Sequence, residues 1–231
     1  MPAAALTLPE YYSRRAPEYE RMWYRDDPVR QSEQAAIVAV MQRLFAGRRV
    51  LEVACGTAYW TQFVAETAEW VCALDASPPM LALAREKKFP PGKVEFRAGD
   101  AYALGEVPGH FDAGLANFWF SHVPKARREE FLCGFHRRLG AGAAVFMADN
   151  LFVPGLGGEQ VIHPGCEDTF KRRVLADGSK HEVLKNYFDA DQLRQILSPH
   201  ATELQIHVGQ CFWWVSYTVA TCAGSMQLSH G

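Results

Sequence analysis

The chain has 231 residues, of which 48% are hydrophobic and 22% charged, and its formal net charge is −2. This length and composition are typical of one globular domain with a single hydrophobic core. A charge so close to zero supplies no field for attracting nucleic acid or an anionic membrane, so a small molecule is the expected partner. We expect one domain over residues 1–231, as a monomer or a homodimer.

The sequence lacks the signals of membrane insertion and secretion. No apolar run reaches the roughly 18 residues that a membrane-spanning helix needs, and the first residues lack the basic start and apolar middle of a signal peptide. We therefore expect a cytoplasmic protein. The six cysteines include no C-x-x-C pair, and His163 with Cys166 supplies only two ligands, so reduced thiols and no metal site are expected.

The N-terminal part, residues 9–46, mixes aromatic and charged residues before a regular apolar pattern. Pro17 favours short helical pieces over residues 9–30. Apolar residues then follow helical spacing over residues 31–45, and Gly47 supplies a stop. We expect these pieces to form helices and a lid over the rest of the domain.

Residues 48–150 alternate between short apolar runs and helical patterns. This alternation predicts a parallel sheet with crossover helices, which is the core of a doubly wound α/β fold. The expected strands are 49–54, 70–75, 93–98, 111–117 and 143–149, and the expected helices are 59–68, 78–88 and 125–139.

The alternation ends after Asn150. Residues 153–165 contain two prolines and four glycines, which predicts a loop. The runs 170–175 and 181–187 flank an Asp-Gly turn signal and predict a β-hairpin. We therefore expect residues 151–188 to form an insertion on the substrate side of the domain.

The last expected unit spans residues 189–220. Asp189 is expected to cap a helix that ends near Leu197. Two strands, 203–208 and 211–219, are then expected to pair through a tight turn at Gly209.

Acidic residues end three successive expected strands or their loops. These are Glu52, Asp75 and Asp100. Ligands of open parallel sheets bind outside the carboxyl ends of the strands, where these side chains meet. The small residues of loop 53–58 allow a ligand to approach the backbone closely, next to a helix N-terminus.

The positions of these acids indicate an adenosine-containing ligand. Asp75 is placed to accept hydrogen bonds from both hydroxyls of a ribose, and Asp100 to accept one from an exocyclic amine. A dinucleotide cofactor is disfavoured, because the third glycine of the G-x-G-x-x-G fingerprint is replaced by Tyr59, which would obstruct the packing of helix against strand.

Four segments resemble one family in order and in spacing. The stretch Glu52-x-Ala54-x-Gly56-x-Ala58 is similar to the E/D-x-G-x-G-x-G loop of class I S-adenosylmethionine-dependent methyltransferases. Residues 74–81 and 99–101 resemble the second and third motifs of that family. Residues 11–20 look like the small-molecule branch, in which such a segment folds over the cofactor. The resemblance covers about residues 10–150.

The resemblance implies a seven-stranded, mostly parallel, Rossmann-like sheet with an N-terminal helical lid and a β-hairpin insertion after the fifth strand. It also implies S-adenosyl-L-methionine as the cofactor. The loop would contact the methionine part, Asp75 the ribose, and Asp100 with its neighbours the adenine. The residues expected to bind this donor are Tyr12, Tyr19, Glu52, Ala54, Gly56, Ala58, Trp60, Asp75, Ala76, Met80, Asp100, Ala101, Tyr102 and Asn117.

This chain departs from the family pattern at two of the loop glycines. Ala54 and Ala58 stand there, and alanine disfavours the positive φ that glycine adopts freely. The geometry of the loop is therefore left open by the sequence.

The expected reaction is transfer of the donor's methyl group to an O, N, S or C atom of a small molecule. His122, after the fourth strand, is the candidate base, and the alternative is that it caps the next helix. Trp119, His122 and Arg172 are the expected substrate contacts, although a solvated strand edge explains Arg172 equally well. Two alternatives remain open: a protein that binds the donor without methyl transfer, and an aminopropyl-type transferase on the same fold.

Overall fold

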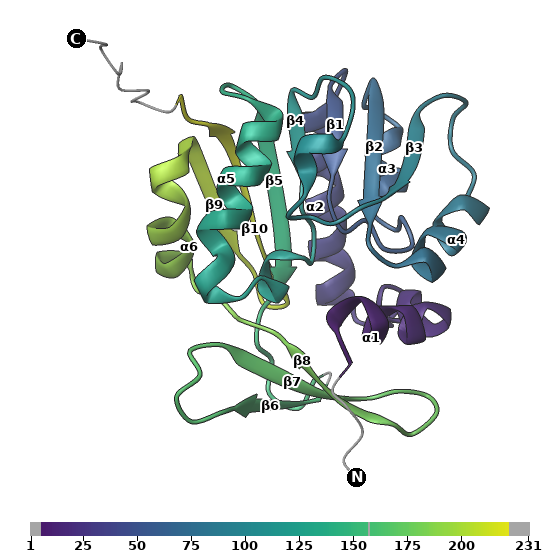
Figure 1. The fold of residues 1–231 in the computed structure, drawn as a ribbon, viewed down its shortest axis with the longest axis vertical. Coiled ribbons are helices and arrows are strands. Elements are labelled where there is room, and N and C mark those ends of the chain that lie inside the picture. The colour runs from purple at the N-terminus through teal and green to yellow at the C-terminus, as the bar shows by residue number, and fades with distance from the viewer. Residues whose placement is uncertain (1–5, 157, 222–231) are drawn as a thin grey trace.

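A computed structural model describes residues 6–156 and 158–221. Seven strands form one sheet in the order β3-β2-β1-β4-β5-β10-β9, and β10 runs antiparallel to both of its neighbours (Figure 1). The expected seven-stranded, mostly parallel sheet is therefore confirmed. The strands are β1 Arg49–Glu52, β2 Trp70–Asp75, β3 Val94–Ala98, β4 Ala113–Leu115, β5 Ala144–Asn150, β9 Ala201–Val208 and β10 Phe212–Val219.

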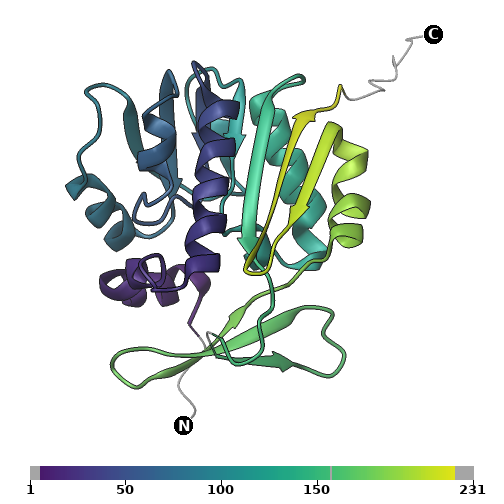
Figure 2. The ribbon, with the colours of Figure 1, turned by 180° about the vertical axis from the view of Figure 1, so that it is seen from behind.

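Helices cover both faces of this sheet. Figure 2 shows α2 across one face, and α5 and α6 lie on the opposite face. Each face has its own apolar core, around Phe120, Phe135 and Trp213 on one side and Ile37 and Phe45 on the other. The helices are α2 Pro28–Phe45, α3 Thr61–Ala65, α4 Pro78–Glu86, α5 Arg128–Leu139 and α6 Ala190–Leu197, with 3₁₀ turns η2 Leu104–Glu106, η3 Phe120–His122, η4 Lys125–Arg127 and η5 Ser198–His200. Among the described residues, no helix is both long and apolar enough to cross a membrane.

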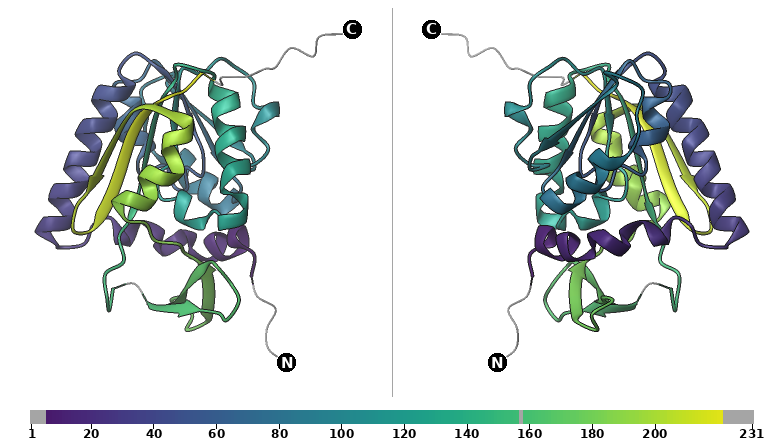
Figure 3. Two further views of the ribbon diagram at one scale, coloured as in Figure 1. Left: turned by 90° about the vertical axis from the view of Figure 1, so that its left-hand side faces the viewer. Right: turned by 90° about the vertical axis from the view of Figure 1, so that its right-hand side faces the viewer.

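The first two elements form the lid. Helix α1 (Leu8–Arg15) begins at a capping box made by Thr7 and Glu10, and the 3₁₀ helix η1 (Ala16–Met22) follows directly, with Pro17 in its first turn. These elements lie between the carboxyl ends of the parallel strands and the insertion (Figure 3). The expectation of short helical pieces in this region is therefore confirmed.

The insertion is a three-stranded antiparallel sheet, made of β6 Glu159–Ile162, β7 Thr169–Val174 and β8 Lys180–Leu184. The hairpin of β7 and β8 was expected. The expectation of a loop over residues 153–165 was wrong in part, because β6 pairs with β7 along its whole length. Glycines and prolines on both sides of this four-residue strand hide it in the sequence, and the pairing itself is a tertiary interaction.

A buried ion pair joins this insertion to the main sheet. Lys185 follows β8, and its Nζ lies 2.6 Å from Oδ1 of Asp149 in β5 and donates to Oγ of Ser121, also at 2.6 Å. Asp149 Oδ2 accepts a hydrogen bond from the backbone N–H of Ser121. Asn186 adds backbone and side-chain bonds to Ser121 and Val123. The end of β8 is thereby fixed against β5 and η3.

We expect Lys185→Met to destabilise the protein strongly, because it leaves the carboxylate of Asp149, which is 0% exposed, without its cation. Loss of one partner of such a pair costs about 3–5 kcal/mol. Urea unfolding at pH 7 measures this change. The control is Arg194→Met, which breaks an exposed pair with Asp191 and should cost at most about 1 kcal/mol. Equal costs for the two variants would contradict the structural role of Lys185.

Candidate functional site

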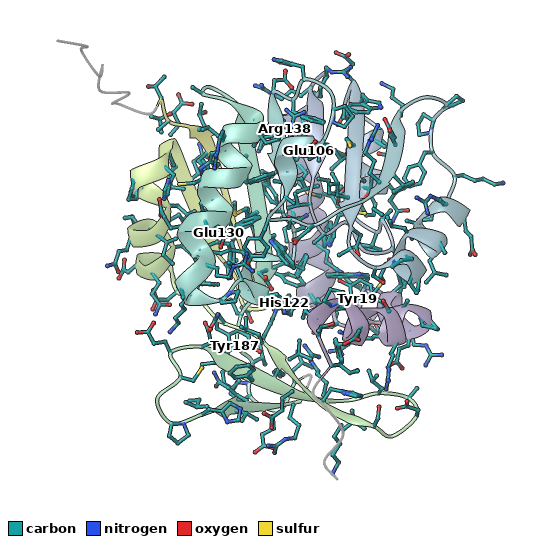
Figure 4. The ribbon with its side chains drawn as sticks, viewed as in Figure 1. Tyr19, Glu106, His122, Glu130, Arg138 and Tyr187 are labelled. Carbon is teal, nitrogen blue, oxygen red and sulfur yellow. The ribbon has the colours of Figure 1, made fainter. Side chains whose placement is uncertain are left out.

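A cavity of about 380 Å³ lies at the carboxyl ends of the strands, between the sheet and the lid. In Figure 4, Tyr19 of the lid and His122 of η3 lie at these strand ends, above the insertion. The expected site residues that line the cavity are Tyr12, Tyr19, Ala54, Gly56, Asp75, Ala76, Met80, Asp100, Ala101, Tyr102, Trp119 and His122. Residues that are more than 100 positions apart in the sequence therefore face the same space.

The loop after β1 adopts the left-handed backbone that its alanines disfavour. The φ angles are 54° at Ala54, 57° at Gly56 and 62° at Ala58. The structure thereby answers the question that the sequence left open: both alanines take up the conformation for which glycine is preferred. The cost of this conformation is of order 1–2 kcal/mol for each alanine.

Asp75 holds this loop in place from the end of β2. Its Oδ2 accepts the backbone N–H of Gly56 and its Oδ1 that of Ser77, both at 2.8 Å. Burial raises the pKa of its carboxyl, although the hydrogen bonds from Ser77 and Gly56 act in the opposite direction. Each carboxylate oxygen has a further lone pair, so Asp75 can brace the loop and also accept hydrogen bonds from a ligand.

Five expected contacts do not line this cavity. Glu52 is buried beneath the loop, Ala58 is fully buried, and Trp60 packs among Trp23 and Phe118. Asn117 is buried, with its amide against the sulfur of Met41. Arg172 lies on the insertion and pairs with Glu159 and Glu182.

The carboxyl of Glu52 is kept neutral by its surroundings. Burial raises its pKa to about 8, and its Oε2 accepts a hydrogen bond from Thr61 Oγ1 at 2.7 Å. This bond joins the end of β1 to the first residue of α3, and its effect on the pKa of Glu52 is opposite to that of burial. Thr61, nine positions further along the chain, gave no sequence signal for this contact.

Sequence reasoning missed several residues that line the cavity. Arg127 is the clearest example: its guanidinium lies 3.7 Å from the centre of the Tyr102 ring. In the sequence, Arg127 is one cation in a charged run with helical spacing, and a solvated residue has the same pattern. The residues missed are Leu8, Pro9, Ser77, Gly99, Phe118, Pro124 and Arg127.

His122 is buried and its two ring nitrogens are both engaged. Nδ1 lies 2.6 Å from the carbonyl oxygen of Leu184, so Nδ1 carries the proton and donates it. Nε2 therefore accepts the hydrogen bond from the Tyr12 hydroxyl at 2.8 Å. Burial, together with the charge of Lys185, lowers the pKa of His122 to about 3. The imidazole is neutral at physiological pH.

The lid contacts both the loop and the second motif. Ser13 and Ser77 hydrogen bond through their hydroxyls at 2.8 Å. The Tyr19 ring lies against Gly56, where an added Cβ would meet the ring at 3.6 Å. The lid therefore closes the cavity over the loop.

The polar groups that line the cavity fit an adenosine sulfonium donor. The Tyr102 hydroxyl and the Trp119 indole N–H are buried without a hydrogen-bond partner among the described residues. Both residues line the cavity, together with the carboxylates of Asp75 and Asp100. A ligand with donors, acceptors and a flat apolar ring would satisfy these groups.

Comparisons with known proteins agree with this arrangement. A family model described as "methyltransferase domain" matches residues 50–142. A ubiquinone biosynthesis O-methyltransferase from Xanthomonas campestris is 33% identical over 181 residues, which are 78% of this chain and 70% of that protein. The solved complex of DhpI with SAH is 27% identical, with a TM-score of 0.70, and the match covers 92% of this chain and 95% of that one.

The chain belongs to the class I S-adenosylmethionine-dependent methyltransferases, as the fold, the site and these matches together establish. S-adenosylmethionine is the cofactor of that family. The chain spans between 27% and 56% of the length of several other curated relatives, including a protein-L-isoaspartate O-methyltransferase from Polaromonas that is 29% identical over 120 residues.

We expect Ala54→Gly to stabilise the protein by roughly 0.5–1 kcal/mol, because the removed cost of positive φ exceeds the opposing cost of the greater entropy that glycine gives the unfolded chain. Thermal or urea unfolding measures the change. The matched control is Ala82→Gly on the exposed side of α4, which should destabilise by about 0.5–1 kcal/mol. Destabilisation of similar size at both positions would show that Ala54 is not strained.

We expect the free energy of unfolding to fall as the pH drops from about 6.5 towards 4. His122 and His136 have folded pKa values lowered to about 3 and about 4, mainly by burial, whereas the unfolded residues protonate near 6.5. Protons therefore bind the unfolded chain first. The slope from these two residues approaches about 2.7 kcal/mol per pH unit.

Urea unfolding at pH 7.5, 6 and 5 measures this slope. The double variant His122→Gln, His136→Gln should have a shallower pH dependence than the unchanged protein. An identical slope in the two proteins would mean that neither imidazole is held neutral by the fold.

Proposed function

We propose that the protein transfers the methyl group of S-adenosylmethionine to a nucleophilic atom of a small molecule. The observation that carries this proposal is the enclosed cavity, in which the strained loop, Asp75 and Asp100 face the same space as Trp119 and His122. The name of the Xanthomonas relative, a ubiquinone biosynthesis O-methyltransferase, supports a small-molecule acceptor, and the name of the Polaromonas relative supports methyl transfer alone. The lid and the insertion leave room for a small acceptor rather than a macromolecule.

The residues at the ends of β2 and β3 would hold the donor. The free lone pairs of Asp75 would accept the ribose hydroxyls, and the exposed carboxylate of Asp100 the adenine amine. Arg127, stacked on Tyr102, would keep that ring fixed beside the adenine. The bound donor supplies an electrophilic methyl group on a sulfonium.

The side chains on the acceptor side would orient the substrate and exclude water. His122 Nε2 and the Tyr12 hydroxyl form a neutral pair that faces the cavity. Since the pKa of His122 is about 3, this imidazole is a weak base. It would position an acceptor or transfer a proton without remaining protonated. Most of the rate would come from alignment of the acceptor with the methyl group in a partly dry site.

A direct assay tests the proposal. Isothermal titration with S-adenosylmethionine, S-adenosylhomocysteine and NAD measures donor binding, and mass spectrometry detects methyl transfer to a panel of small acids, phenols, thiols and amines. We expect binding of the first two ligands and transfer to at least one acceptor class. Donor binding with no transfer across the panel would favour a binding protein, and binding of NAD alone would refute the assignment.

We expect Asp75→Asn to weaken binding of S-adenosylhomocysteine by about 10- to 100-fold, because charge-assisted hydrogen bonds to the ribose are lost. Asp75 also braces the loop, so the variant alone does not isolate the ribose contact. The control is a thermodynamic cycle with the 3′-deoxy analogue of the ligand. In that cycle, replacing the ligand by its analogue should lower the affinity of the unchanged protein clearly and that of the variant only slightly. Additive losses would remove Asp75 from the ribose site.

A further inference from the structure

A second cavity, of about 40 Å³, lies between the lid, the end of β5 and the insertion. Six of its twelve lining residues are cationic, and no Asp or Glu is among the described residues that line it. We call it the cationic cavity. Its cations are Arg15, Arg25, Arg30, Lys171, Arg173 and Lys185.

These cations come from three separate parts of the chain. Arg15 belongs to the lid, Arg30 to α2, and the lysines and Arg173 to the insertion. Cations on the solvated face of a single helix or strand would be exposed to water. Lys171, Lys185 and Arg30 are each only 3% exposed. The fold therefore gathers like charges in a place where they repel one another.

Much of this charge has no counter-charge among the described residues. The side chain of Arg173 has no hydrogen bond or ion pair there. The Arg15 guanidinium has no ion pair among the described residues: it donates to the sulfur of Met22 at 3.8 Å and lies 5.4 Å from the centre of the Tyr19 ring. Burial acts to lower the pKa of Arg15, and the charge of Glu18 is among the causes that raise it. The buried Nε of Arg30 is likewise without a hydrogen-bond partner in the described chain. Lys185 alone pairs with an acid, Asp149. Burial lowers the pKa of Lys171 to about 8, and the neighbouring cations Arg173 and Lys185 act in the same direction.

The alternation along β7 separates these cations from an ordinary strand edge. Lys171 and Arg173 face the cationic cavity, whereas Arg172 between them points to the other face and pairs with Glu159 and Glu182. Arg172, the expected substrate contact, therefore lines a neighbouring cavity and not the cationic cavity. The composition of this strand did not show that two of its three cations face the cationic cavity.

The cationic cavity shares a wall with the donor cavity. Tyr12, Tyr19 and His122 line the donor side. On the other side, the Arg15 guanidinium lies 5.4 Å from the centre of the Tyr19 ring, and Lys185 bonds to Ser121, the residue before His122. Figure 4 shows Tyr187, which lines the cationic cavity, between His122 and the insertion. A molecule seated in the cationic cavity is therefore next to the site of methyl transfer.

We propose that the methyl acceptor is a small organic acid whose oxyanion group, a carboxylate or a phosphonate or phosphate, is held in the cationic cavity by Arg15, Arg173 and Lys185. This inference rests on the proposed function, because it names the acceptor of the same reaction. The oxyanion supplies the counter-charge that Arg15 and Arg173 lack, next to the pair of Lys185 and Asp149. The remainder of the acceptor then extends along Tyr12 and His122 towards the donor.

The test is a titration of the full chain, saturated with S-adenosylhomocysteine, with benzoate, phenylphosphonate and the neutral benzyl alcohol. Isothermal titration measures the dissociation constants. We expect at least one of the two anions to bind at least about tenfold more tightly than benzyl alcohol. The preferred anion distinguishes a planar carboxylate from a tetrahedral oxyanion. Equal affinity for all three probes would overturn the proposal.

The two neighbouring arginines of β7 provide a matched pair of variants. Arg173→Gln should weaken binding of the preferred anion by about 10-fold or more, because a charged hydrogen bond is lost. Arg172→Gln removes the same charge from the outer face and should change the affinity less than about twofold. Equal effects of the two variants would show a diffuse field instead of a site, and would contradict the proposal.

These measurements separate the two proposals. Binding of S-adenosylhomocysteine is measured before the anion is added, and anion binding does not require methyl transfer. Selective anion binding with no methylated product from any acceptor of the panel would leave the cationic cavity as a binding site and contradict the methyltransferase function. Methylation of neutral acceptors only, with no anion binding, would support that function and refute the cationic cavity as the acceptor site.

Discussion

The buried pair of Lys185 and Asp149 is the interaction on which the geometry of the site depends. It joins the end of β8 to the end of β5, and through Ser121 it also fixes η3, which carries His122. Removing two charges from water is costly, and the pair is retained at a point where a short linkage decides the position of an entire three-stranded sheet. The hydrogen bonds of Asn186 to Ser121 and Val123 and that of His122 to Leu184 act at the same junction, so the wall between the two cavities is held at several adjacent points.

The loop after β1 shows a second constraint of the same kind. Ala54 and Ala58 are held in a strained conformation, and the Asp75 carboxylate holds the loop through the N–H of Gly56. One side chain therefore organises the backbone around the donor cavity from the neighbouring strand. Strain persists at a site when surrounding contacts over-determine it, as the lid does here by packing Tyr19 on the loop.

Periodic features were predictable from the sequence, and features that depend on partners far away in the chain were not. Strands such as Trp70–Asp75 carry their own apolar pattern, so their limits and their order along the chain followed from the residues. The strand Glu159–Ile162 has meaning only beside β7. Glu52 followed the family motif, yet its burial against Thr61 depends on how α3 packs. Arg172 and Arg173 are chemically equivalent in the sequence, and only the register of the insertion decides which one faces the cationic cavity.

His122 is neutral chiefly because it is buried. On one side it faces the donor cavity, and on the other are Lys185 and Arg173, whose charges also lower its pKa. A protonated imidazole there would add a third positive charge to a poorly hydrated wall. The Nδ1 proton bound to Leu184 and the Tyr12 hydroxyl donated to Nε2 complete its hydrogen bonds without any charge. An acid bound beside His122 would therefore have the cations of the cationic cavity on one side and the methyl donor on the other. The neutral imidazole between them would not compete with those cations for the oxyanion.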